Sequence, residues 1–524
     1  MARPLPGSAR RRTLGALAGT GLLAACGAAS PRLRLGDSPP EDVPPLVPDA
    51  LERALAALPE DVEAIRGPAG VPGVAVAVVA GGQRRFARGF GRRRIDQAAP
   101  VTTETVFQIA SLSKPLAASV VATQVAAGRC AWDDPAQRHL PWLRLSDPGI
   151  AARASIGDFM AHRTGLPAYA GDQLEDLGFG RRAILERLRL LPLRPFRASY
   201  AYSNFGLTLG AEAAAAAAGQ DWESLAESAL YRPLGMGATS SRHADFLARA
   251  DRAVLHARTP EGFRPLYDRD ADAQSPAGGV SSNVLDLAAW MTMLLAGGAP
   301  LVPAEALAPA FQPQALSAPG HVPGARPGFY GFGFNVGVGP GGRVMLGHSG
   351  AFLLGGATAM QLLPGEGIGI VVLTNAAPVG VAEAIAATFL DRLQFGAPQR
   401  DWAATFGEAF AAFFAPEGDL AGKTPPVPAT APRAPEACLG RYDNAFHGPA
   451  EVVRGPSGLL LRLGPKAVDM PLLPWDGDDF AMAPGGENAP PGSLASLRFD
   501  MAGGRAVGFR AQYYDASGLG RWTR

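Results

Sequence analysis

The chain has 524 residues, of which 47% are hydrophobic and 18% charged, and its formal net charge at pH 7 is +1. This composition is typical of a globular protein with a large core, divided into two or three folded units. A nearly neutral chain without a basic stripe gives no support to nucleic acid or an anionic membrane surface as a partner, and we expect neither.

The first residues have the pattern of an export signal. Arg10, Arg11 and Arg12 precede an apolar stretch, residues 14–25, that is too short to span a bilayer. Adjacent arginines indicate the twin-arginine route. The run Leu23-Ala24-Ala25-Cys26-Gly27 resembles the lipobox of bacterial lipoproteins, which implies cleavage before Cys26 and lipidation of its sulfur. We therefore expect a signal peptide over 1–25 and an exported protein, either periplasmic or membrane-anchored through Cys26. An ordinary cleaved signal with a chance cysteine is the alternative.

Residues 26–48 are rich in proline and predict a flexible linker. Apolar residues then recur at three- and four-residue spacing over 50–65, which predicts a helix that Pro59 could interrupt. A strand-like run over 73–79 and a turn at Gly81-Gly82 predict a hairpin with residues 84–91. A helix followed by antiparallel strands favours an α+β domain.

The middle of the chain, roughly 115–300, is predicted to be mostly helical, with the clearest helices at 211–218 and 286–295. Strand patterns return at 332–337, 343–346, 357–363 and 368–373, and a helix is predicted at 381–393. We therefore expect strands from both ends of this region to form one antiparallel sheet flanked by helices, with a helical subdomain inserted between them.

A proline- and alanine-rich linker over 415–437 precedes a segment of short alternating runs and glycine-rich turns. This pattern predicts a small all-β barrel. The expected domains are the α+β domain at 49–400, a helix and linker at 401–436, and the barrel at 437–524. Besides Cys26, the cysteines are Cys130 and Cys438, whose spacing indicates neither a disulfide framework nor a metal site.

A serine and a lysine lie three residues apart at an expected helix start, in Ser111-Leu112-Ser113-Lys114. Residues i and i+3 share a helix face, so the amine can reach the hydroxyl. A serine hydroxyl needs a neighbouring base to become a good nucleophile, and lysine can be that base when its pKa is lowered. The other lysines are Lys423 and Lys466, in a chain that otherwise uses arginine. A lysine here indicates that a removable proton is required.

Two further short motifs carry groups suited to acyl transfer. Tyr202-Ser203-Asn204 supplies a hydroxyl that can relay a proton and an amide that can hold a substrate carbonyl. Gly347-His348-Ser349-Gly350-Ala351 follows an expected strand, where a glycine allows the substrate backbone to approach closely.

In this order, Ser111-x-x-Lys114, Tyr202-x-Asn204 and His348-x-Gly350 resemble the three signatures of the class C β-lactamases. Relatives of these enzymes include D-alanyl-D-alanine carboxypeptidases, D-aminopeptidases and esterases. The flanking stretches at 132–135, 162–167 and 277–282 also agree, and the resemblance covers about residues 60–395. It implies a β-lactamase-like serine hydrolase that needs no metal or cofactor.

The resemblance also implies a role for each residue. Ser111 attacks the acyl carbon, while Lys114 and Tyr202 shuttle its proton. Asn204, His348 and Gly350 bind the substrate. The backbone N–H groups of Ser111 and Ala351 form the oxyanion hole.

One residue departs from the family pattern, and the C-terminal segment resembles a domain that some members carry. Many β-lactamases and carboxypeptidases have lysine where this chain has His348, which is largely neutral at pH 7. This departure favours an ester or a D-peptide-like amide as substrate over a β-lactam or a D-alanyl-D-alanine peptide. The segment from Leu439 through Phe480 resembles the small lipocalin-like barrel appended to some of these hydrolases.

The sequence also allows two other hypotheses, a different nucleophile and a non-catalytic protein. Gly347-His348-Ser349-Gly350-Ala351 approximates the nucleophile elbow of α/β-hydrolases, with Ser349 attacking, although the second glycine is replaced by Ala351. A non-catalytic lipoprotein that senses peptidoglycan-like ligands is the alternative from another class. A small molecule or a peptide is the expected partner in either case, and the sequence does not determine the oligomeric state.

Overall fold

The strands expected near both ends of the hydrolase region lie in one antiparallel sheet in a computed structural model, which describes residues 43–524 except residue 457. The sheet order is β2-β1-β12-β11-β10-β9-β8-β7. The bounds are β2 (Gln83–Gly91), β1 (Gly73–Ala80), β12 (Ile368–Thr374), β11 (Gly356–Leu363), β10 (Val344–Phe352), β9 (Asn335–Val338), β8 (Gly328–Tyr330) and β7 (Ala315–Ala318). The expected signal peptide and the lipobox-like run that contains Cys26 lie outside the described residues.

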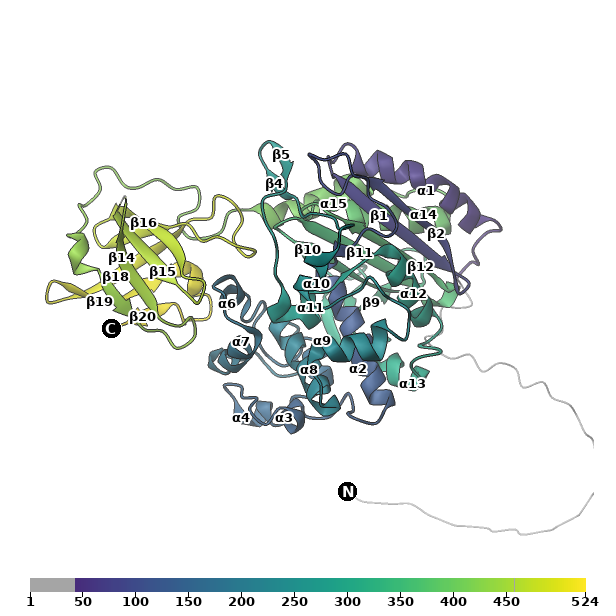
Figure 1. Cartoon of the computed structure of the whole chain (residues 1–524), viewed down its shortest axis with the longest axis horizontal. Coiled ribbons are helices and arrows are strands. Elements are labelled where there is room, and N and C mark those ends of the chain that lie inside the picture. The colour runs from purple at the N-terminus through teal and green to yellow at the C-terminus, as the bar shows by residue number, and fades with distance from the viewer. Residues whose placement is uncertain (1–42, 457) are drawn as a thin grey trace, which may run out of the picture. The chain divides into compact units, whose positions relative to one another are not determined.

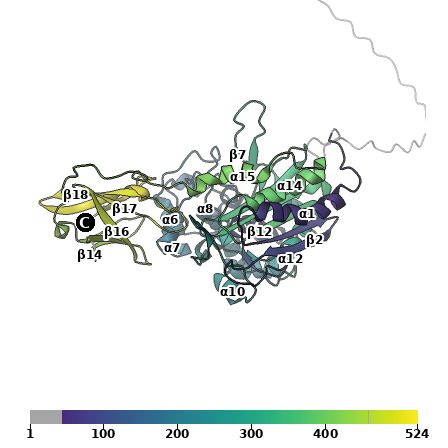
Figure 2. The same ribbon diagram turned by 90° about the horizontal axis from the view of Figure 1, so that it is seen from above.

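Helices cover both faces of this sheet. Helices α1 (Ala50–Arg66) and α14 (Val381–Phe395) pack side by side on one face, and α12 (Val284–Leu295) packs against β1 and β12 from the other (Figures 1 and 2). Every residue of β1 is buried. A strand covered on both faces reads as a continuous apolar run, which is why 73–79 shows no alternation.

The helical subdomain between β2 and β7 carries most of the remaining helices. Its longest are α2 (Ser113–Ala126) and α8 (Asn204–Ala218). The shorter helices are α3 (Ala136–His139), α4 (Pro148–Ala151), α5 (Ile156–Met160), α6 (Asp172–Asp176), α7 (Arg181–Arg187), α9 (Trp222–Ala226), α10 (His243–Ala248), α11 (Ser275–Gly278) and α13 (Ala304–Leu307). Two small antiparallel pairs join β3 (Phe107–Gln108) to β6 (Ser281–Ser282) and β4 (Ala257–Thr259) to β5 (Gly262–Arg264).

Three local expectations need correction. Pro59 does not interrupt the first helix, because α1 runs on to Arg66 and is held by packing of its buried face against α14. The strand expected at 332–337 begins only at Asn335. The third motif does not follow a strand but lies within β10, which continues to Phe352.

The C-terminal segment forms a second antiparallel sheet of eight strands in the order β13 to β20. These strands are β13 (Gly440–Tyr442), β14 (Ala450–Gly455), β15 (Gly458–Leu463), β16 (Val468–Asp476), β17 (Asp479–Met482), β18 (Ala495–Ala502), β19 (Arg505–Ala511) and β20 (Arg521–Thr523). A bridge between Asp443 and Thr523 brings the two edges together, so the barrel is nearly closed. Tyr442, Phe509 and Trp522 fill its centre. The expected α+β fold followed by an all-β barrel is confirmed.

The short helix α15 (Trp402–Ala411) follows the hydrolase region, and a largely irregular stretch leads to β13. Cys130 and Cys438 are free thiols and both are buried. Within the described part of the chain, no helix is long and apolar enough to cross a membrane.

Candidate active site

Ser111 lies in a single 3₁₀ turn, Ala110–Leu112, that leads directly into α2. Ala110 adopts a left-handed conformation with φ of 47°, which is unusual for a residue with a side chain. Ser113 fixes the turn, because its Oγ donates to the carbonyl of Ala110 at 2.6 Å and accepts from the N–H of Val280 at 3.1 Å. The turn that carries the Ser111 hydroxyl is thus held by hydrogen bonds of Ser113, one to Ala110 within the turn and one from Val280 outside it.

Lys114 is completely buried one helical turn after Ser111. Its Nζ lies 3.0 Å from Ser111 Oγ, 2.7 Å from Asn204 Oδ1 and 2.8 Å from the carbonyl oxygen of Ala277. Three acceptors match the three hydrogens of an ammonium group, so the amine has a single defined position. The spacing of three residues therefore brings the amine to the hydroxyl, as the sequence predicts.

Tyr202 and Asn204 reach the same point from the start of α8. The Tyr202 hydroxyl donates to Ser111 Oγ at 2.7 Å. Between them, Ser203 caps the helix by accepting a hydrogen bond from the N–H of Gly206 at 3.0 Å. At this capped start of α8, the Tyr202 side chain reaches Ser111 and the Asn204 side chain reaches Lys114. The Tyr-x-Asn spacing is therefore explained by the local geometry of a helix N-terminus.

His348 is buried on β10, and both of its ring nitrogens have partners. Nδ1 lies 2.6 Å from the carbonyl oxygen of Ser349, so Nδ1 must carry the hydrogen. Nε2 lies 2.9 Å from the Tyr330 hydroxyl and therefore accepts from it. Burial, and next the charge of Lys114, lowers the pKa of His348 to about 3. His348 is thus a neutral imidazole and supplies no fixed positive charge.

The edge of β10 is open beside Ser111. Strand β9 pairs with β10 only from Val344 to Gly347, whereas β11 pairs with it through Phe352. Beyond Gly347, one edge of β10 therefore has no neighbouring strand in the described sheet. Gly350 lies at this edge, where an added Cβ would meet the carbonyl oxygen of Ile109 and would come within 2.9 Å of the Ser111 nitrogen.

We expect the Gly350→Ala substitution to lower kcat for ester hydrolysis by about 10-fold or more, because the Ser111 turn must move. The matched control is Gly337→Ala in β9, where an added Cβ meets nothing within 4 Å. Steady-state kinetics of both variants check this prediction. Equal rates for Gly350→Ala and Gly337→Ala would contradict the close approach of β10 to Ser111.

Burial lowers the pKa of Lys114 from 10.5 to about 7, and the negative charge of Asp172 opposes this shift. Burial also raises the pKa of the Tyr202 hydroxyl well above its usual 10. Tyr202 therefore stays protonated, and Lys114 is the group that can become a free base near neutral pH.

We expect kcat/KM to fall as the pH is lowered through about 7, the value to which the pKa of Lys114 is shifted. Only the neutral amine can take a proton, so activity is present above this pKa and lost below it. The neighbouring His162 and His348 do not titrate in this range, because burial lowers the pKa of both. Asp172, whose pKa is raised to about 7, titrates together with Lys114. A rate profile that stays flat down to pH 5 would contradict Lys114 as the base.

Three contributing residues were not identified from the sequence. Asp172 accepts a hydrogen bond from Asn204 Nδ2 at 2.8 Å, and Tyr330 donates to His348. His162 Nδ1 accepts from the N–H of Ser203 at 3.2 Å and so helps to fix the Tyr202 segment. Of these, only His162 lies in a stretch that contributes to the family resemblance.

Ser349, the alternative nucleophile, is not placed as an elbow. An elbow requires a sharp turn between a strand and a helix, whereas Ser349 is in the middle of β10. The hydrogen bonds of Lys114 Nζ and the Tyr202 hydroxyl go to Ser111. The geometry thus favours Ser111 over Ser349.

The beta-lactamase family model matches residues 51–393, a range that contains Ser111, Lys114, Tyr202 and His348. The chain belongs to this family. The part of the chain that matches the family therefore contains all three converging side chains, those of Ser111, Lys114 and Tyr202.

Named relatives of this beta-lactamase-family protein include an unguisins hydrolase of Aspergillus campestris, 27% identical over 58% of this chain and 58% of the relative. A D-aminopeptidase of Gluconobacter oxydans is 26% identical over 46% of this chain and 44% of the relative. The chain thus spans less than two thirds of either relative. A solved structure, the octameric penicillin-binding protein homologue from Pyrococcus abyssi, matches 90% of this chain and 99% of that chain with a TM-score of 0.57 and 19% identity. This last likeness concerns the fold alone.

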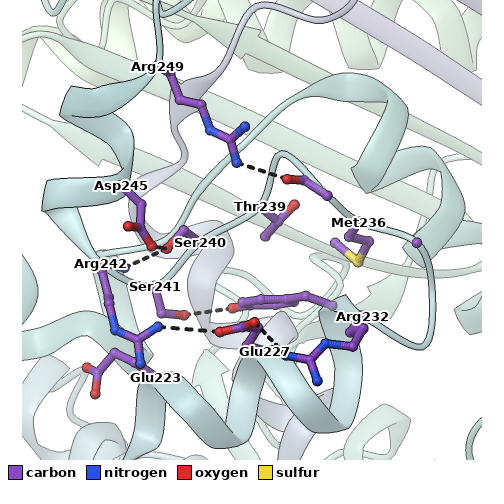
Figure 3. Close-up of a pocket in the computed structure, with 13 residues that line it drawn as sticks. Glu223, Glu227, Arg232, Met236, Thr239, Ser240, Ser241, Arg242, Asp245 and Arg249 are labelled. Carbon is purple, nitrogen blue, oxygen red and sulfur yellow. Dashed lines mark hydrogen bonds and ion pairs between the residues drawn. The ribbon is translucent and has the colours of Figure 1, made fainter.

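Ser111, Tyr202 and His348 line one cavity, whereas a separate cavity that none of these motif residues lines lies between α9 and α10 (Figure 3). Its arginines already have partners. Arg232 and Arg242 pair with Glu227, and Arg249 donates to the carbonyl oxygen of Gly237 at 2.9 Å. Among residues 43–524, leaving 457 aside, no group of three His, Cys, Asp or Glu side chains is arranged to hold a metal ion.

Proposed function

We propose that the protein is a serine hydrolase that cleaves esters or amides through an acyl-enzyme on Ser111. The observation that carries this proposal is the convergence of Lys114 Nζ and the Tyr202 hydroxyl on one serine oxygen, at 3.0 and 2.7 Å. A base and a proton relay on a single hydroxyl are what nucleophilic catalysis requires. The named hydrolase and aminopeptidase relatives support the same reaction class.

In the proposed reaction, neutral Lys114 takes the proton of Ser111 as the serine oxygen bonds to the acyl carbon. The backbone N–H groups of Ser111 and Ala351 then stabilise the negative oxygen of the tetrahedral intermediate. Tyr202, which stays protonated, relays the proton from Lys114 to the leaving oxygen or nitrogen as the acyl bond breaks. Water hydrolyses the acyl-enzyme by the same route in reverse.

The substrate-binding roles proposed for Asn204, His348 and Gly350 differ in how they would work. Gly350 would act through the backbone, because its missing side chain lets β10 lie close to the Ser111 turn, where an added Cβ would come within 2.9 Å of the Ser111 nitrogen. His348 would contact the substrate as a neutral ring, because both nitrogens are engaged. This favours substrates that do not need a cation beside the scissile bond, and it disfavours efficient β-lactam or D-alanyl-D-alanine hydrolysis.

A burst experiment with p-nitrophenyl butyrate tests this function. If Ser111 forms an acyl-enzyme, p-nitrophenol is released when the mature protein is mixed rapidly with the ester. When deacylation is slow, the release begins with a burst of up to one equivalent. When deacylation is too fast to give a burst, the expected result is covalent labelling of Ser111 by a fluorophosphonate. A protein that gives neither turnover nor a covalent label would instead be a non-catalytic ligand-binding protein.

We further propose that the protein is exported with a signal peptide at 1–25 and, after the linker, carries the hydrolase domain at 49–400 and the barrel at 437–524. The basic N-terminus and the lipobox-like run before Cys26 support export with a lipid anchor. Mass spectrometry of the mature N-terminus in a membrane fraction tests this. An unmodified N-terminus would overturn lipidation at Cys26.

A further inference from the structure

Asp172 on α6 is a buried carboxylate with one oxygen left unused. The residue is 5% exposed and lines the same cavity as Ser111. Oδ2 accepts from Asn204 Nδ2 at 2.8 Å, whereas Oδ1 is buried without a hydrogen-bond partner among the described residues. A buried carboxylate oxygen without a partner is costly, so its retention in a ligand cavity indicates that a ligand donor satisfies it.

Asn204 connects this carboxylate to the nucleophile. Lys114 Nζ donates to Asn204 Oδ1 at 2.7 Å and to Ser111 Oγ at 3.0 Å. The amide of Asn204 is therefore bonded at both ends, with Lys114 on one side and Asp172 on the other. Asp172 is thus connected to Ser111 through the side chains of Asn204 and Lys114, and Asp172 and Ser111 line the same cavity.

The charges around the cavity favour a cation over an anion. Arg269 also lines the cavity, but it is buried against Glu175 in an ion pair. His348 is neutral. Two other carboxylates line the cavity, but Glu487 accepts from the N–H groups of Leu353 and Leu354 and Glu417 is exposed to solvent. Asp172 Oδ1 is the buried oxygen without a donor among these described side chains, and an ammonium group offers both a positive charge and N–H donors.

We propose that Asp172 is a specificity-determining residue that binds a protonated amine on the acyl part of the substrate. This inference rests on the proposed serine hydrolase function and narrows its substrates to amino-acid esters or amides with a free amino group. Besides its proposed contact with the substrate, Asn204 is a positioning residue, which holds Asp172 and Lys114 in place.

The electrostatics of Asp172 agree with this assignment. Burial, and next the charge of Glu175, raises the pKa of Asp172 to about 7, while the hydrogen bond from Asn204 and the charge of Lys114 oppose the rise. Asp176 on the same helix also raises it. A bound ammonium would favour the ionised carboxylate and bring its pKa down.

The test compares alanine methyl ester with N-acetylalanine methyl ester, for each enantiomer, because acetylation removes the charge of the amine. We expect wild-type kcat/KM to favour the free amine by about 30-fold or more for one enantiomer. The Asp172→Asn variant should bring this ratio down by at least about 10-fold. Because both esters use the same Ser111 and Lys114, the ratio cancels any effect of the substitution on the base. The control Asp133→Asn alters an exposed carboxylate and should leave the ratio unchanged.

Several results would overturn the inference. One is a wild-type ratio of one or less, and another is an unchanged ratio in Asp172→Asn. A third is failure to hydrolyse either methyl ester while Ser111-dependent turnover of p-nitrophenyl butyrate persists. If Ser111→Ala leaves all ester turnover intact, the proposed function itself fails instead.

Discussion

Replacing Ser111 with alanine is expected to lower kcat for p-nitrophenyl butyrate by at least about 10³-fold. The substitution removes the only oxygen on which Lys114 Nζ and the Tyr202 hydroxyl converge among the described residues. The lysine would keep its bonds to Asn204 and Ala277, so the fold should be retained. Steady-state kinetics on the purified variant, with a thermal melt to check folding, measure the effect.

Ser349→Ala is the matched control for this experiment. It makes the same chemical change in the neighbouring strand β10, and we expect its kcat to stay within a few-fold of wild type. If Ser349→Ala loses activity and Ser111→Ala keeps it, the assignment of the nucleophile is wrong. If both variants keep activity, the observed hydrolysis does not come from either serine.

Lys114→Met is expected to lower kcat by about 10³-fold or more, because methionine has a similar length but cannot take a proton. Tyr202 cannot replace the lysine as base, since burial holds its pKa well above 10. The variant also leaves Asn204 Oδ1 and the carbonyl of Ala277 without their donor, so a lower melting temperature is expected too.

The control for Lys114→Met is Lys423→Met, which removes an exposed lysine and should change neither kcat nor stability. Folded Lys114→Met protein is identified by its circular dichroism before kinetics are compared. A folded Lys114→Met variant with more than about a tenth of wild-type kcat would contradict the role of Lys114 as base.

Much of the fold follows from local patterns. The buried run of β1 and the strands β11 and β12 have the apolar character of strands covered on both faces. Pro59 shows where local patterns are insufficient. Its effect on α1 depends on packing against α14, a helix more than three hundred residues away in the chain. Long-range packing of this kind cannot be derived from the spacing of nearby residues.

The residues of the candidate site also fall into two groups, those that local sequence patterns predict and those that only the folded chain brings together. The pairing of Ser111 with Lys114 is local, because i and i+3 share one helix face. Tyr202 and His348 could be associated with them only through the family resemblance. Asp172 and Tyr330 come from a short helix and a short strand with no motif around them. Their contacts with Asn204 and His348 exist only in the folded chain, so no pattern in the sequence indicates them.

The most direct test of the central claim is to locate the covalent label left by a fluorophosphonate. The mature protein is labelled to completion, digested, and the modified peptide is sequenced by tandem mass spectrometry. A single adduct on Ser111 is the expected result, with labelling slowed at low pH as Lys114 becomes protonated. An adduct on Ser349 or another residue, or no adduct on an active preparation, would contradict Ser111 as the nucleophile.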